Sequence, residues 1–158
     1  MNQITTQYVT ENGACYEQYV ITDPAAKTSL TITPERGGMI TGFTLDGDEY
    51  IWTRRPNFSE CNRPRFGVPV LFPSCGNPDG GVHNFDGKAY PMETHGFADL
   101  CGWDVESVGP DGVTLALEST PLTKFLYPFD FTLLVNYNLE GNKAAISLTV
   151  INEGDKPM

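Results

Sequence analysis

The most informative part of the chain is residues 129–151, which read FDFTLLVNYNLEGNKAAISLTVI. Residues 129–139 are rich in β-branched and aromatic side chains and are predicted to form one long strand. Glu140-Gly141-Asn142 is typical of a turn, and residues 144–151 form a second β-rich run. The sequence therefore predicts a long hairpin of two antiparallel strands.

The rest of the chain shows the same kind of pattern. Further strands are predicted at residues 16–22, 28–33, 39–45, 49–52, 104–108 and 113–118, with turns at Asp46-Gly47 and at residues 109–112. Sixteen glycines and twelve prolines separate these runs. The best helical candidate, residues 121–127, is short and stops at Pro128. Many short strands at close spacing predict an all-β fold, an antiparallel β-sandwich or barrel.

Length and charge narrow the class of protein. The 158 residues fit a single domain, residues 1–158. The net charge of −10 excludes a basic footprint for nucleic acid, and an anionic membrane surface would repel the chain. No apolar run approaches the roughly 20 residues of a membrane-spanning helix, and residues 1–6 do not resemble a secretion signal. We therefore expect a soluble, cytoplasmic protein without a nucleic-acid or membrane partner.

The four cysteines are Cys15, Cys61, Cys75 and Cys101. They are widely spaced and form no CxxC pair, so neither a thioredoxin-type motif nor a local zinc site is indicated. We expect reduced, mostly buried thiols, because an unpaired cysteine behaves as a small apolar residue.

Residues 53–98 interrupt the β pattern. The segment has few regular strands and contains both histidines, and a long irregular stretch in a compact domain is usually functional. His83 lies in the turn-rich run GGVHNFDG and is interpreted as an exposed loop residue. His95 is followed by Gly96, which lets the backbone bend, and by Phe97, which can anchor the loop to the core. By residue type alone, His95 is either structural or a group that exchanges protons near neutral pH.

Two arginines stand next to an apolar run in the same segment. Arg63 and Arg65 flank Pro64, and residues 66–73 are expected to form an apolar strand. A guanidinium group in this place can donate to sugar hydroxyls or to a phosphate, and a surface ion pair is the alternative. Asn77 offers a donor and an acceptor to a ligand, or it only forms a turn.

Five motifs occur in order along the chain. They are TPERGGMI at residues 33–40, RPRFGVPVLFPSCGN at 63–77, HGFA at 95–98, YPFDF at 127–131 and VINEGDKPM at 150–158. In this order the motifs resemble those of the aldose 1-epimerase (galactose mutarotase-like) superfamily. That family carries Arg-Gly-Gly-Ile-Pro, His-Gly-Phe-Ala, Tyr-Pro-Phe-x-Phe and Val-x-Asn-x-Gly-x-x-Pro-Met. The chain is most similar to the glucose-6-phosphate 1-epimerase-like branch.

The resemblance implies a β-supersandwich with a carbohydrate groove on one sheet. It also implies a reaction that interconverts the α and β anomers of an aldose without a metal or an organic cofactor. A base takes the proton of the anomeric hydroxyl, an acid protonates the ring oxygen, the C1–O5 bond opens, and the ring closes on its other face. Each proton-transfer group typically contributes about 10²–10⁴-fold to the rate. In the family the acid is a histidine and the base is a glutamate.

The resemblance further assigns roles to three residues of this chain. Arg65 takes the position of a sugar-contacting arginine, and His95 takes that of the first active-site histidine, which binds and polarises sugar oxygens. Asn77 is a possible contact at the rim. Asp99 departs from the family, which often has arginine there, and its carboxylate is expected to repel a sugar phosphate. Phe66 also departs, because it replaces the first glycine of Arg-Gly-Gly.

The chain is shorter than the family members that it resembles. Family members have about twice this domain-sized length, and their second histidine and their glutamate follow the Pro-Met signature. We therefore expect an aldose 1-epimerase-like protein acting on a hexose, of which this chain is the N-terminal part. The alternative is a noncatalytic carbohydrate-binding β-sandwich, for which a homodimer would cover exposed strand edges. A purely structural β domain is the third interpretation.

Overall fold

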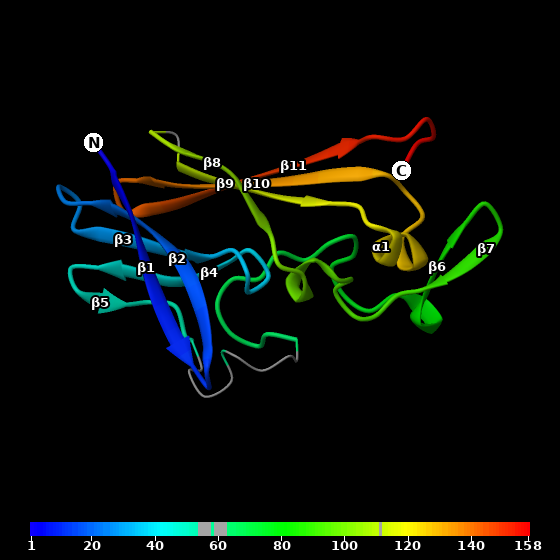
Figure 1. Cartoon of the computed structure of the whole chain (residues 1–158), viewed down its shortest axis with the longest axis horizontal. Helices are drawn as coiled ribbons and strands as arrows, with labels where there is room; N and C mark the ends of the chain where they lie inside the picture. Colours follow the sequence, from blue (N-terminus) through cyan, green and yellow to red (C-terminus); the bar gives the residue numbers. More distant parts are fainter. Residues whose placement is uncertain (54–57, 59–62, 111) are drawn as a thin grey trace.

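The computed structural model of the protein describes residues 1–53, 58, 63–110 and 112–158. Two antiparallel sheets dominate this part of the chain (Figure 1). The first has the order β1-β2-β3-β4-β5 and consists of β1 (Gln3–Glu11), β2 (Ala14–Asp23), β3 (Thr28–Thr33), β4 (Met39–Leu45) and β5 (Asp48–Glu49). The second has the order β11-β10-β9-β8 and consists of β8 (Asp104–Gly109), β9 (Gly112–Glu118), β10 (Phe131–Glu140) and β11 (Lys143–Asn152).

The core lies between these two sheets. Alternate residues of β10 are almost completely buried, and they are Phe131, Leu133, Val135, Tyr137 and Leu139. They belong to one apolar cluster with residues of the first sheet, namely Ile21, Leu30, Ile32 and Ile40. The alternation of residues 131–139 therefore marks the buried face, and the predicted all-β antiparallel sandwich is confirmed.

Long-range hydrogen bonds connect the two sheets, and two of them involve Tyr137 and Thr28. The Tyr137 hydroxyl donates to the Gly38 carbonyl oxygen at 2.6 Å, and the pair is buried. The Thr28 hydroxyl donates to the carbonyl oxygen of Gly141 at 2.8 Å, at the β10–β11 turn. Both bonds join residues about a hundred positions apart, so they fix how one sheet lies on the other.

Two of the predicted strands are absent or shortened in the structure. Residues 66–73 form no strand; among the described residues they make only the isolated bridges Ile40–Val68 and Phe72–Gly96. Proline removes a backbone donor and is poorly tolerated in a strand interior, and both Pro69 and Pro73 lie in this run. The strand predicted at residues 49–52 is limited to β5, because the Glu49 carboxylate accepts the backbone N–H groups of Phe43 and Ile51.

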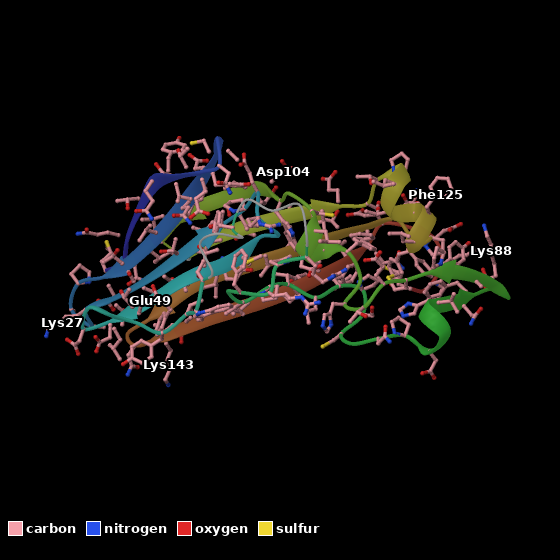
Figure 2. The ribbon with its side chains drawn as sticks, turned by 90° about the horizontal axis from the view of Figure 1, so that it is seen from below. Lys27, Glu49, Lys88, Asp104, Phe125 and Lys143 are labelled. Carbon is pink, nitrogen blue, oxygen red and sulfur yellow. The ribbon has the colours of Figure 1, made fainter. Side chains whose placement is uncertain are left out.

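Three further elements complete the fold. β6 (Val82–Phe85) and β7 (Lys88–Pro91) form a hairpin inside the segment expected to be irregular, and α1 (Pro121–Leu126) is the predicted short helix. Thr120 begins that helix, since its side chain and that of Thr123 form a capping box. The molecule is elongated, with Lys27 at one end and Lys88, on the β6–β7 hairpin, at the other (Figure 2). No helix in the described ranges is long and apolar enough to cross a membrane.

The cysteines are less buried than expected. Cys15 and Cys75 are exposed and Cys101 is half-buried, all three as free thiols; Cys61 lies outside the described residues. Burial raises the pKa of the Cys101 thiol, and the nearby Asp99 carboxylate raises it further. The prediction of mostly buried thiols is therefore wrong for Cys15 and Cys75, because both stand in polar, exposed backbone segments.

Candidate functional site

A cavity of about 1100 Å³ opens between the Arg63–Leu71 segment, the loop after β7 and helix α1. Its described lining is largely apolar, with Pro64, Pro69, Leu71, Met92 and Leu126 among the contributors. Arg65, Asn77 and His95 all line this one cavity. The structure thus brings together the three residues for which the sequence predicted contact with a sugar.

Two segments that run side by side at the parallel bridge Phe72–Gly96 contribute to the wall of the cavity. Phe72 O accepts the backbone N–H groups of Phe97 at 2.9 Å and Ala98 at 3.2 Å. The Val68 N–H donates to Ile40 O at 2.9 Å, which ties the first segment to the edge of β4. The two bonds to Phe72 O hold the HGFA motif against the FGVPVLFP run, so two of the five sequence motifs meet in space.

Phe97 anchors the His95 loop as the sequence predicted. It is buried and packs edge-on to Phe72 with ring centroids 6.2 Å apart. Phe72 in turn contacts Tyr127 at 5.6 Å and Phe131 at 5.1 Å between ring centroids. An aromatic layer from the YPFDF motif and β10 therefore forms the floor on which the loop lies.

His95 has an unusual backbone and a fixed ring. Its φ is 71°, in the left-handed region that few residues other than glycine adopt. The backbone N–H of His95 donates to Gly76 O at 2.8 Å, and the Gly76 N–H donates to the ring Nδ1 at 3.0 Å. Because Nδ1 accepts a hydrogen bond from the Gly76 N–H, the neutral ring carries its own proton on Nε2. The half-buried side chain lines the cavity and has an Nε2–H group available as a donor.

Arg65 and Asn77 are both exposed at the cavity. Arg65 makes no hydrogen bond or ion pair with the described residues, so its guanidinium donors remain available there. It also lines a neighbouring hollow of about 450 Å³ together with Tyr50 and Trp52. The Asn77 side-chain oxygen accepts the Thr94 hydroxyl at 2.8 Å, which leaves the amide N–H groups of Asn77 for a ligand.

Arg63 forms an ion pair, but with the buried Asp99 and not at the surface as the alternative for the two arginines had it. Its Nη1 donates to Asp99 Oδ1 at 2.6 Å and to Oδ2 at 2.7 Å, and its Nη2 donates to Gly96 O at 2.8 Å. The Arg63 side chain is only 19% exposed and that of Asp99 only 1%. Burial raises the pKa of the Asp99 carboxyl, and the Arg63 guanidinium offsets part of that rise.

The pairing of Asp99 changes one conclusion drawn from the sequence. The Asp99 carboxylate was expected to repel a sugar phosphate, but its charge is compensated by Arg63 and both of its oxygens accept from that side chain. Sequence reasoning missed the pair, because the partners are 36 positions apart and nothing local to Asp99 indicates its burial.

His83 lies elsewhere. It is half-buried in strand β6, where its ring contacts Phe85 with centroids 5.8 Å apart, and it does not line the cavity. The interpretation of His83 as an exposed loop residue is wrong, because Asp86-Gly87 turns the chain into the β6–β7 hairpin. Asp-Gly is a strong hairpin signal, and it was available in the sequence.

The lining combines apolar and polar side chains. The cavity combines apolar walls with a few separate donors and acceptors, the usual design of a small-molecule site. Its described charged residues are two arginines and two carboxylates, Arg63, Arg65, Glu93 and Asp99. Within the described residues no group of three or more His, Cys, Asp or Glu side chains is placed to hold a metal ion.

Comparison with known proteins identifies a family and individual relatives of this chain. The family model described as aldose 1-epimerase matches residues 17–158. Protein LacX (plasmid) of Lactococcus lactis subsp. lactis is 28% identical over 129 residues, covering 77% of this chain and 42% of LacX.

Solved structures of proteins similar to this chain have the same fold. The Slr1438 protein from Synechocystis sp. PCC 6803 superposes with a TM-score of 0.83 at 32% identity, covering 87% of this chain and 49% of that protein. A galactose mutarotase related enzyme from Lactobacillus acidophilus superposes with a TM-score of 0.76 at 28% identity, covering 87% of this chain and 44% of that enzyme. The chain therefore spans about half the length of the relatives it matches.

Proposed function

Because the chain belongs to the aldose 1-epimerase family, we propose that its cavity binds an aldose in the ring form and that the protein takes part in interconverting the α and β anomers of a hexose. One observation carries the proposal. Arg65, Asn77 and His95 come from separate segments, and all three line one cavity beside apolar walls. A role in cytoplasmic carbohydrate metabolism is part of the same proposal.

The geometry suggests what each group does. The Nε2–H of His95 donates to a sugar oxygen and polarises it, because Nδ1 is already engaged by the Gly76 N–H. The Arg65 guanidinium donates to neighbouring hydroxyls, and Asn77 contacts the sugar at the rim. Opening the C1–O5 bond builds up charge on oxygen, which positioned donors stabilise. The acid and the base of the reaction are groups other than these three.

An uncharged hexose is the substrate that the charges favour. The described lining contains as many carboxylates as arginines, and Arg63 is already paired with Asp99. The cavity of about 1100 Å³ is slightly larger than the roughly 300–1,000 Å³ typical of small-molecule sites. It therefore accommodates a monosaccharide with room for water.

Calorimetric titration of the protein with galactose and glucose tests the proposal. We expect saturable binding that His95→Ala weakens by roughly 3–10-fold, the value of one lost hydrogen bond. Arg65→Ala is expected to weaken it by about 10–100-fold, because the lost bonds are charge-assisted. His83→Ala is the control, since His83 lies outside the cavity lining and should bind sugar as the unmodified protein does.

Polarimetry of freshly dissolved α-anomers separates the two carbohydrate hypotheses. Measured on the full-length protein, faster equilibration that needs His95 supports the epimerase, whereas saturable binding without acceleration supports a noncatalytic binding module. Absence of both sugar binding and acceleration would refute the proposed function.

A further inference from the structure

Arg63 connects to more of the His95 loop than a simple ion pair requires. Two of its nitrogens donate hydrogen bonds to three oxygens, both carboxylate oxygens of Asp99 and the carbonyl oxygen of Gly96, and Nη2 also lies 3.6 Å from Oε2 of the exposed Glu93. Gly96 directly follows His95, and Asp99 lies in the short 3-10 turn Ala98–Leu100 that ends the motif. The planar guanidinium therefore clamps the loop at two points on the same side.

The loop needs such a clamp because its backbone is strained. His95 has φ 71°, and Gly96 follows with φ 75°. A non-glycine residue in this region persists only where its surroundings hold it. From the core side the Trp103 indole N–H holds the loop by donating to Ala98 O at 3.0 Å. From the cavity side Arg63 is the cation that holds it.

Arg63 is poorly suited to bind substrate itself. Its side chain is only 19% exposed, and both terminal nitrogens already donate within the protein. Arg65, two residues later, is exposed at the same cavity and makes no hydrogen bond with the described residues. The two arginines therefore differ in their surroundings. Arg65 is exposed at the cavity, and Arg63 is bonded to the His95 loop.

We propose that Arg63 is the positioning residue of His95: through Asp99 and the Gly96 carbonyl it keeps the ring Nδ1 on the Gly76 N–H and presents Nε2–H to the cavity. Its effect on sugar affinity rests on the proposed function. Its effect on the His95 ring does not, so the two claims are tested separately.

The first test is nitrogen NMR of the protein with ¹⁵N-labelled histidine rings. In the unmodified protein we expect His95 to occupy one tautomer, protonated on Nε2. The variant Arg63→Met/Asp99→Leu removes both charges, so it leaves no buried charge unpaired. In it we expect His95 to average between tautomers while the His83 ring, an internal reference, stays unchanged. Arg65→Met is the matched control and should leave both rings unchanged.

A His95 ring that keeps its Nε2-protonated tautomer in Arg63→Met/Asp99→Leu would overturn the proposal. If that variant does not fold, Arg63→Lys serves instead, because it keeps the positive charge but cannot reach all three oxygens from one ammonium group. We expect Arg63→Lys to broaden the His95 ring signals, and unchanged signals would again overturn the proposal.

The second test is galactose affinity. We expect Arg63→Met/Asp99→Leu to weaken binding at least about 3-fold, and to have no further effect when His95→Ala is already present. A loss of the same size in the His95→Ala background would show that Arg63 does not act through His95. If the unmodified protein binds no sugar, the proposed function fails, and the tautomer measurement still decides the role of Arg63.

Discussion

Gly96 is the residue at which the site is least tolerant of change. Its φ is 75°, and a Cβ atom there would overlap the carbonyl oxygen of Phe72, to which the loop is bonded. Glycine is therefore required at position 96 for two reasons: the left-handed backbone conformation and the close approach of Phe72. Both parts keep His95 at the cavity.

Substitution of Gly96 separates these two parts. We expect Gly96→Ala to lower the free energy of unfolding by about 3 kcal/mol or more, since the left-handed backbone alone costs roughly 1–2 kcal/mol and the overlap adds to it. Gly87→Ala is the matched control, because Gly87 has φ 76° with open space around it, and it should lose only about 1–2 kcal/mol. Urea denaturation measures both, and equal losses would show that the contact with Phe72 is unimportant.

Asp99 makes stability depend on pH in a defined direction. Burial raises its pKa in the folded protein above the ordinary value of 3.8, with Arg63 lowering it in part. Between the two pKa values the folded chain then binds more protons than the unfolded chain, so the free energy of unfolding contributed by Asp99 falls as pH rises through that window. That contribution is fully present below the unfolded pKa.

Denaturation of the unmodified protein and Asp99→Asn from pH 3 to pH 7 measures this contribution. We expect the stability of the unmodified protein to fall relative to Asp99→Asn as pH rises through the folded pKa of Asp99. A relative rise over the same range would mean that Arg63 outweighs burial and that the pKa of Asp99 is lowered.

The residues of the candidate site were predictable mainly through the motifs. Residue type alone left His95 open between a structural and a chemical role, and only the order of the motifs singled out Arg65, Asn77 and His95. The structure places these three at one cavity; their roles stay predictions. The Arg63–Asp99 pair and the left-handed backbone of His95 were not predictable, because both depend on contacts between distant segments.

At the scale of elements, the pattern of apolar and polar residues predicted most of the buried strands well and the segments between them poorly. β3 and β4 have the predicted bounds, and β10 and β11 agree to within two residues at each end. In β10 alternate residues are buried, in β3 nearly so, and the first four residues of β4 are all buried. β1 was missed since Gln3–Glu11 is rich in threonine and glutamine and is largely exposed. It is held by backbone pairing along its whole length with β2, which side-chain pattern does not reveal.

Substitution of Tyr137 measures how much its hydrogen bond to Gly38 stabilises the contact between the two sheets. We expect Tyr137→Phe to lower the free energy of unfolding by about 1–3 kcal/mol, because it leaves the buried Gly38 carbonyl without this donor. Tyr8→Phe is the control, since the Tyr8 hydroxyl donates to Glu17 at an exposed position, and its effect should stay within about 0.5 kcal/mol. Thermal or urea unfolding compares them, and equal effects would argue that the buried bond does not stabilise the sandwich.

At the scale of the whole molecule, β11 is an uncovered edge of the core. It pairs with β10 on one side and has no strand pairing on its other side within the described residues. Ile146, Leu148 and Val150 are opposite the buried β10 residues Tyr137, Val135 and Leu133, yet they are 49%, 51% and 46% exposed. Figure 1 shows the C-terminal part of β11 extending beyond the end of the five-stranded sheet.

This uncovered stripe predicts self-association of the 158-residue chain. We expect sedimentation velocity to show a mass that increases with concentration, because an apolar stripe beside an open strand edge favours pairing with a second copy. Leu148→Lys should reduce the association. Ser147→Lys adds the same charge on the opposite face of β11 and should leave it largely intact, and equal effects of the two substitutions would contradict this origin.

The central claim, that the cavity lined by Arg65 and His95 is a sugar site, is tested most directly by a crystal structure of the protein with galactose. The account predicts a sugar ring in this cavity with one of its oxygens within about 2.7–3.2 Å of His95 Nε2 and the Arg65 guanidinium on a neighbouring hydroxyl. An empty cavity at a galactose concentration that saturates binding, or a sugar bound elsewhere on the protein, would contradict it.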